Sequence, residues 1–385
     1  DETGEISGLS HLLEHTVFRA TETRDSFMMA KQIEGAGGEI NAFTGRECTA
    51  FYGITIDETA SVAMDIVGDI VANPKLTAED TELEKQIVLQ ELSMIKSEPE
   101  TYIHDLFESQ IWRGHPLSRD EGGDEEIVAA LTSADLRKYY EEKYRIPSLS
   151  VYAVGAVDPE ETAEWAGNAL DGLAGGRRNI RTEPPRPVSG YRFERNDSDH
   201  YQIAIGFPAY GACHRDRTAA SMLNALLGSG TSSRLFQEIR EKKALVYSVY
   251  STVSQCSDAS SLAAYMSCTG SNVCEAVDTA ESEFRRFLDE GFGEKELERA
   301  KNLTKGAVIR SAESAESRLY MLGMCHLLTG SAESLDDRLA RIDAVTAEDV
   351  MRAAGDILDP GRMNIVILGK GRKKFEEIDP SLFSF

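Results

Sequence analysis

The segment Leu131-Thr-Ser-Ala-Asp-Leu136 recurs 214 residues later as Val345-Thr-Ala-Glu-Asp-Val350. In each copy a threonine is followed by acidic residues, a pattern typical of a capped helix start. Each predicted helix leads to an apolar run, Ser150–Gly155 or Asn364–Gly369, and these two runs are also 214 residues apart. Such short apolar runs favour strands. The chain therefore carries the same helix-then-strand unit twice.

Two further matches extend this repeat. Glu82-Leu-Glu-Lys85 corresponds to Glu296-Leu-Glu-Arg299 at the same offset, and Leu13–Thr21 can be aligned with Leu223–Thr231 at an offset of 210. A nearly constant offset over widely separated segments indicates a duplicated domain.

A stretch rich in proline and arginine, residues 174–190, lies between the two copies and predicts a linker. We therefore predict a first domain over 1–173 and a related second domain over 191–385. Strand runs and helix runs segregate in each half, which predicts an α+β fold of two homologous α/β sandwich domains, each a mixed or antiparallel sheet covered by helices. The segments behind this prediction are Ala50–Ile56 and Val246–Thr252 as strands, and Thr59–Val71, Ala78–Lys96 and Asn272–Asp289 as helices.

The two halves differ at their beginnings. The second half has about 30 residues, Gly190–Ala220, before the helix that matches the one at His11, and they include the strand-like run Tyr201–Phe207. The first half has only ten residues in that place. We therefore expect the first domain to lack its N-terminal strand in this sequence, the strand being cleaved off, disordered before Asp1 or supplied by another chain.

Composition limits the class of protein. The chain has 385 residues, 41% of them hydrophobic, and no apolar run of the roughly 18 residues that a membrane span needs. Its net charge of −24 disfavours nucleic acid and anionic membranes as partners and suits cationic or neutral peptides. The six cysteines form no C-x-x-C pair and the first residues do not resemble a signal peptide, so we expect reduced thiols in the cytoplasm or another reducing compartment such as an organelle matrix.

The segment His11-Leu-Leu-Glu-His15 carries the strongest chemical signal. In a helix over 8–19, His11 and His15 lie at i and i+4 on one face, where two neutral imidazoles can bind Zn²⁺. Glu14 lies beside them, in the H-x-x-E-H order of the inverzincins. The alternative is a helix that carries two histidines by chance, although the chain has only 7 histidines.

A catalytic zinc needs a third protein ligand, and Glu91 is the best candidate. It lies in the predicted helix Ala78–Lys96, two turns after Glu84, so both carboxylates point the same way. The face that they share is otherwise apolar, with Ile87, Val88, Leu92 and Ile95, and a carboxylate there is costly unless it is ligated or paired. The alternative is that these carboxylates belong to a solvated face.

Four motifs resemble the metallopeptidase family of pitrilysin, insulin-degrading enzyme and the mitochondrial processing peptidase. They are GLSHLLEHTVFRAT at 8–21, GGEINAFTGRECTAFY at 37–52, EKQIVLQEL at 84–92 and SRLFQEIREKKALVYSVYS at 233–251. The likeness extends from Gly8 to about Gly369, and the size resembles the short-chain, processing-peptidase-like branch. The chain departs from the family pattern at Ala20 and Gln90, neither of which is a ligand position.

This resemblance implies a role for each site residue. His11, His15 and Glu91 would ligate one zinc ion per chain. Glu14 would be the general base and Glu84 a supporting acidic residue.

The resemblance also implies the residues that hold the substrate. Asn41, Ala42 and Phe43 would lie on an edge strand that pairs with the substrate backbone. Arg240 would hold a substrate carbonyl and Tyr247 would stabilise the oxyanion from the second domain. The repeat places Ser221, Asn224, Ala225 and Lys305 opposite the metal-site residues, so the second domain cannot bind zinc in this way.

The resemblance implies a zinc endopeptidase that cleaves short or unfolded peptides inside a clamshell chamber. A chain of this length would form half of such a shell, so a partner is implied: a second copy first, a paralogue second. The acidic surface would favour basic peptides. The alternative is a non-catalytic peptide-binding or structural subunit of a heteromeric peptidase-like complex.

Overall fold

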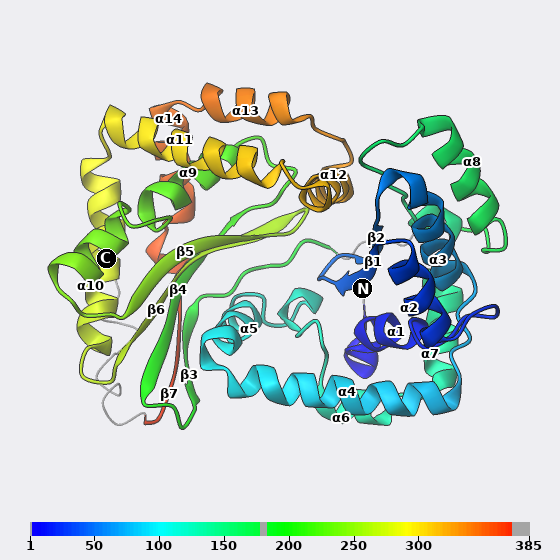
Figure 1. Cartoon of the computed structure of the whole chain (residues 1–385). Coiled ribbons are helices and arrows are strands. Elements are labelled where there is room, and N and C mark those ends of the chain that lie inside the picture. Colours follow the sequence, from blue (N-terminus) through cyan, green and yellow to red (C-terminus); the bar gives the residue numbers. More distant parts are fainter. Residues whose placement is uncertain (1, 178–182, 372–385) are drawn as a thin grey trace. The chain divides into compact units, whose positions relative to one another are not determined.

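The computed structural model describes residues 2–177 and 183–371, which form two compact units (Figure 1). The first unit comprises the described residues of 1–94, 119–183 and 315–320, and the second those of 95–118, 184–314 and 321–385. Both units mix helices with strands, which confirms the predicted α+β class. None of the helices in the described ranges combines the length and the apolar character that crossing a bilayer requires.

The first unit is mainly helical around one small antiparallel sheet. Strand β1 (Glu39–Thr44) pairs with β2 (Thr49–Ile54), with Glu39 opposite Ile54 and Thr44 opposite Thr49. The helices pack around a core that includes Leu12, Leu13, Ile66 and Val88. They are η1 (Gly4–Ile6), α1 (Leu9–Val17), α2 (Ser26–Gly35), η2 (Asp57–Thr59), α3 (Ala60–Ala72), α4 (Ala78–Ser97), α6 (Glu125–Ala130), α7 (Ser133–Lys143), η4 (Ile146–Ser148) and α8 (Pro159–Leu170).

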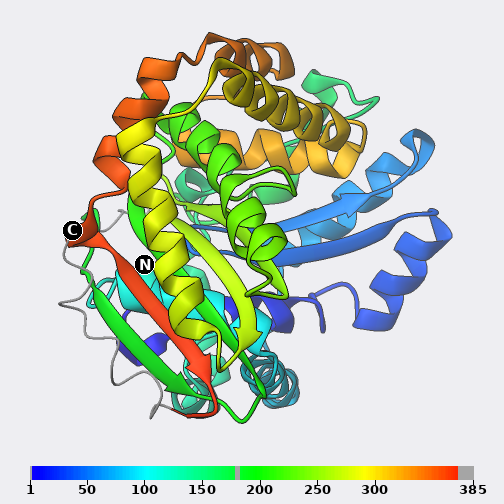
Figure 2. The ribbon, with the colours of Figure 1, turned by 90° about the vertical axis from the view of Figure 1, so that its left-hand side faces the viewer.

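The second unit is built on a five-stranded sheet in the order β3-β7-β4-β6-β5, in which β3 and β7 are parallel and the other pairs antiparallel. Figure 2 shows β7 as the red strand of this sheet. The strands are β3 (Gly190–Arg195), β4 (His200–Tyr210), β5 (Ser248–Gln255), β6 (Ala259–Thr269) and β7 (Asn364–Gly369). The helices are α5 (Pro99–Ile111), η3 (Pro116–Ser118), α9 (Arg217–Leu227), the π-helix η5 (Phe236–Lys242), α10 (Val273–Glu290), α11 (Glu294–Ser311), α13 (Leu335–Ala344), α14 (Ala347–Ile357) and η6 (Pro360–Arg362). Helix α12 (Ala315–Thr329) belongs to both units, since its residues 315–320 lie in the first and the rest in the second.

Alternation along β4 explains why helices cover both faces of this sheet. Ile203 and Ile205 belong to the core that α9, α10 and α14 complete, whereas Ala204 between them packs with Phe107 of α5. Successive side chains of a strand point to opposite faces, so the apolar run Ile203–Phe207 of β4 is buried on both.

The repeated helix starts form as predicted. Thr132 and Asp135 make a reciprocal capping box at the start of α7, and Thr346 and Asp349 make the same box at the start of α14. In each box the threonine hydroxyl and the carboxylate satisfy backbone N–H groups that the first turn leaves without partners.

The compact units are interleaved along the chain. Residues 95–118 belong to the second unit, because Ile103 and Phe107 of α5 pack under its sheet. The boundaries 1–173, 174–190 and 191–385 stay a prediction, and the linker lies partly outside the described residues.

The predicted strand Ser150–Gly155 is wrong. These residues have no regular secondary structure, and Val151 is exposed. The corresponding β7 lies between β3 and β4, whereas no described strand of the first unit flanks residues 150–155. A strand needs a hydrogen-bonded neighbour, and without one the apolar pattern alone does not produce it.

Candidate metal centre

Helix α1 presents the histidines because its other side is apolar. Leu9, Leu12, Leu13 and Val17 are buried, and this stripe fixes the rotation of the helix. His11, Glu14 and His15 then lie together on the remaining side, as the i, i+4 spacing predicts.

The N-terminus of α1 is capped by Glu2, which lies six residues before the N-cap position. The N-cap is Gly8 in the left-handed region, and it has no side chain to offer. The Glu2 carboxylate replaces it, accepting hydrogen bonds from the backbone N–H of Gly8 at 2.8 Å and of Ser10 at 2.6 Å. A carboxylate at a helix N-terminus also interacts favourably with the helix dipole.

Helix α4 supplies the carboxylates. Val88 and Leu92 are buried, and the Lys85 ammonium donates to the carbonyls of Ala129 and Leu131 at 3.1 and 3.0 Å. These contacts orient α4 toward α1. The predicted apolar face is wrong in one respect, because Ile87 is 41% exposed.

Three side chains converge in the first unit. His15 Nε2 lies 3.4 Å and His11 Nε2 lies 3.9 Å from Glu91 Oε2, and the two imidazole centroids are 4.7 Å apart. One ligand atom from each residue lies within 4.8 Å of the others, and the described residues hold no other such group.

The arrangement fits zinc. Bond lengths of about 2.0–2.2 Å in a tetrahedron separate ligand atoms by roughly 3.4 Å. The observed 3.4 and 3.9 Å are close to that spacing. Two imidazoles and one carboxylate are a donor set of catalytic zinc sites, in which the fourth position stays open.

Glu84 supports the cluster without joining it. Its Oε2 lies 3.1 Å from His15 Nδ1, and its side chain is nearly buried. A carboxylate on the second ring nitrogen fixes the tautomer and ring orientation of a histidine ligand, leaving Nε2 for the metal. His11 Nδ1, in contrast, is buried without a hydrogen-bond partner among the described residues.

Burial and charge set the protonation of His11. Burial, helped by the neighbouring His15, lowers the pKa of His11 to about 4. The imidazole is therefore neutral at neutral pH, which is the form that binds a metal.

Glu14 lies beside the cluster and is buried. Burial raises the pKa of its carboxyl group, and a hydrogen bond donated by the Thr44 hydroxyl to Oε2 opposes that rise. Sequence reasoning missed Thr44, although it lies in the quoted motif at 37–52 and shares a strand face with Ile40 and Ala42. It also missed Glu2. The only sequence signal for Glu2 is that an acidic residue shortly precedes a helix start.

The predicted strand at Asn41, Ala42 and Phe43 is present as β1, and its pairing with a substrate stays a prediction. Among the described residues β1 pairs only with β2, so its other edge carries no strand. Asn41 is exposed, and its side-chain oxygen accepts from the Ala42 N–H at 2.8 Å. The Phe43 ring packs on Tyr320, with the centroids 5.6 Å apart.

Arg240 and Tyr247 belong to the second unit. Arg240 is exposed on η5, and its guanidinium stacks over the Phe236 ring at 4.9 Å. Tyr247 is 76% exposed, and its backbone N–H donates to the Ser267 carbonyl at 2.7 Å. Their part in the site stays a prediction.

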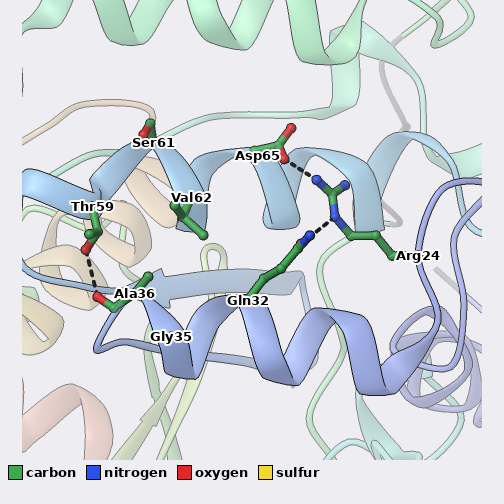
Figure 3. Close-up of a pocket in the computed structure, with 8 residues that line it drawn as sticks. All are labelled: Arg24, Gln32, Gly35, Ala36, Thr59, Ser61, Val62 and Asp65. Atoms are coloured by element: carbon green, nitrogen blue, oxygen red, sulfur yellow. Dashed lines mark hydrogen bonds and ion pairs between the residues drawn. The ribbon is translucent and has the colours of Figure 1, made fainter.

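A surface pocket of about 520 Å³ lies between α2 and α3 and contains none of the metal-site residues (Figure 3). Arg24 enters it, but its guanidinium already bonds Gln32, Asp65 and Asp69. The arginine is therefore engaged in holding α2 to α3.

Comparison with known proteins finds two family models that match successive parts of the chain. The family described as Insulinase (Peptidase family M16) matches residues 1–124, and the Peptidase M16 inactive domain matches residues 130–304. The chain is 32% identical over 379 residues to an uncharacterized zinc protease of Mycobacterium leprae, a match covering 96% of this chain and 84% of that one. It is 30% identical over 353 residues to the uncharacterized zinc protease YmxG of Bacillus subtilis, covering 91% of this chain and 85% of that one.

Two solved structures share the fold. A protease from Helicobacter pylori has a TM-score of 0.88 at 20% identity, covering 96% of this chain and 91% of that one. The peptidase M16 inactive domain from Pseudomonas fluorescens has a TM-score of 0.87 at 20% identity, covering 95% and 89%. The fold, the family matches and the extent of the sequence identity together show that this chain belongs to the insulinase family of peptidases, M16.

Proposed function

We propose that the protein is a zinc-dependent endopeptidase. The observation that carries this proposal is the convergence of His11, His15 and Glu91 with the buried Glu14 beside them. The zinc protease names of the relatives and the family membership add support.

His11, His15 and Glu91 would hold the zinc, and Glu84 would orient His15. A bound zinc ion supplies Lewis-acid chemistry, polarising the scissile carbonyl and lowering the pKa of water to about 7. Glu14 removes a proton from the attacking water as its oxygen bonds to the carbonyl carbon. Glu14 then delivers this proton to the amide nitrogen as the C–N bond breaks, so the carboxylate is regenerated.

The rest of the chain binds the substrate. The open edge of β1 at Asn41, Ala42 and Phe43 would pair with an extended backbone, which restricts substrates to short or unfolded peptides. Arg240 would hold a substrate carbonyl, and Tyr247 would donate a hydrogen bond to the oxyanion. We further propose that two copies form the working chamber, because one chain carries both the metal motif and the Arg–Tyr motif.

The decisive experiment measures zinc content and cleavage of an unfolded peptide for wild type, Glu14→Gln and the control Glu34→Gln. Glu34 is an exposed residue of α2. We expect about one zinc per chain in all three proteins, and a loss of cleavage of about 10²–10⁴-fold in Glu14→Gln alone. A wild type that binds zinc but cuts nothing, alone or as a dimer, would make the protein a non-catalytic subunit.

A further inference from the structure

The buried Glu14 carboxylate is held on one side only. Its Oε2 accepts the hydrogen bond from the Thr44 hydroxyl, whereas Oε1 accepts none from the described residues. Thr44 Oγ1 also lies 3.4 Å from Thr49 Oγ1 on the neighbouring strand. The Thr49 hydroxyl therefore lies next to the one that holds the Glu14 carboxylate.

The chemistry of the groups sets the direction of these hydrogen bonds. An ionised carboxylate only accepts, so Thr44 donates its single proton to Glu14. Thr49 must then donate to Thr44.

We propose that Thr44 is a positioning residue for Glu14; the inference rests on the proposed function. The terminal torsion of a glutamate is broad, so the carboxylate does not select one orientation by itself. Holding Oε2 on Thr44 leaves Oε1 as the oxygen that takes the proton from water. Proton transfer requires a heavy-atom separation of about 2.6–3.2 Å, so a small misplacement is costly.

The position of Thr44 on β1 adds a second consequence. The same strand carries Asn41 and Ala42, whose backbone edge is proposed to pair with the peptide. Side chains alternate along a strand, so Thr44 faces Glu14 while its backbone belongs to the peptide-binding element. One strand thus sets the place of both the substrate backbone and the base.

The test compares Thr44→Val, Thr44→Ser and Thr44→Ala with wild type, and uses Thr59→Val as a matched control. Thr59 also lies in the first unit, but its hydroxyl donates to the carbonyl of Ala36. We expect Thr44→Val and Thr44→Ala to lower kcat by about 10–100-fold, with KM changed less than about twofold and zinc content unchanged. Thr44→Ser keeps a hydroxyl and should retain most of the activity, as should Thr59→Val.

A second measurement does not depend on activity. In metal-free protein labelled with ¹³C at the glutamate carboxyl carbons, the Glu14 resonance is the one that Glu14→Gln removes. Thr44→Val and Thr44→Ala should shift this resonance, whereas Thr44→Ser and Thr59→Val should leave it in place.

The outcomes separate the inference from the proposed function. An unmoved Glu14 resonance in folded Thr44→Val and Thr44→Ala overturns the inference, as does wild-type kcat in these variants. Equal losses in Thr44→Ser and Thr44→Val overturn it too, because the hydroxyl would then be irrelevant. If wild type binds zinc and cuts nothing, the proposed function fails, and the resonance still decides whether Thr44 holds Glu14.

Discussion

Glu84 and Glu91 lie two turns apart on α4 and contact the same histidine at different nitrogens. Glu91 Oε2 lies 3.4 Å from His15 Nε2, and its side chain is 39% exposed. Glu84 Oε2 lies 3.1 Å from Nδ1, and its side chain is 8% exposed. Under the proposed function, Glu91 is a zinc ligand and Glu84 orients the imidazole between them.

This division predicts different losses of metal affinity. Glu91→Gln removes one of the three proposed ligands, so zinc binding should fail at micromolar metal. Glu84→Gln removes only the charge that orients His15, and it should weaken zinc by about 10–100-fold. Competition with a chelator of known affinity measures both, and Glu79→Gln, an exposed position at the start of α4, is the control. An equal loss in Glu84→Gln and Glu91→Gln would contradict the assignment.

Among elements, α1 depends most on a single backbone conformation. Gly8 has φ +89, and a Cβ there would lie 2.5 Å from the Gly122 carbonyl and 2.7 Å from Val128 Cγ2. Gly123 packs directly against Gly8, and a side chain on Gly123 would overlap the Gly8 backbone. Helix α1, which carries His11 and His15, therefore begins where two glycine-containing segments of backbone cross closely.

Gly8→Ala should destabilise the protein by roughly 2–6 kcal/mol, combining about 1–3 kcal/mol of backbone strain with about 1–3 kcal/mol of overpacking. Gly37→Ala is the matched control, because Gly37 also has positive φ but its Cβ would meet no atom within 4 Å. It should lose only the strain, about 1–2 kcal/mol. Urea unfolding measures both, and similar losses would show that the close crossing does not matter.

At the scale of the whole molecule, the sequence repeat predicts two related halves, and the described residues hold one group that could bind a metal, in the first half. The sequence repeat aligns Lys305 with Glu91, and the Lys305 ammonium pairs with Asp343 at 2.6 Å. A cation in that place repels a metal ion. The second half therefore lacks the ligands and also carries a charge that opposes metal binding.

The net charge of −24 predicts how the protein selects peptides. At low ionic strength kcat/KM for a lysine-rich peptide should exceed that for an acidic peptide of equal length by tenfold or more. The difference should shrink as salt shortens the Debye length from about 30 Å at 0.01 M to about 8 Å at 0.15 M. An uncharged peptide should show little salt dependence. Equal rates at low salt would rule out electrostatic selection.

Much of the site could be predicted because it depends on local periodicity. His11 and His15 lie one helical turn apart, so their proximity needs only that α1 be a helix. The capping boxes at Thr132 and Thr346 are equally local. The exposure of Ile87 was not predictable in this way, because a helical pattern shows which residues share a face but not which neighbour covers it.

The sequence by itself determined the helix starts, the pairing of the two histidines and the family to which the chain belongs. Tertiary structure alone decided that Glu91 reaches them from 76 residues away, that Thr44 holds Glu14, and that residues 150–155 form no strand. The first set rests on interactions within one turn of helix, which short sequence spacing specifies. The second set rests on contacts between distant segments, which exist only once packing has chosen the neighbours of each element.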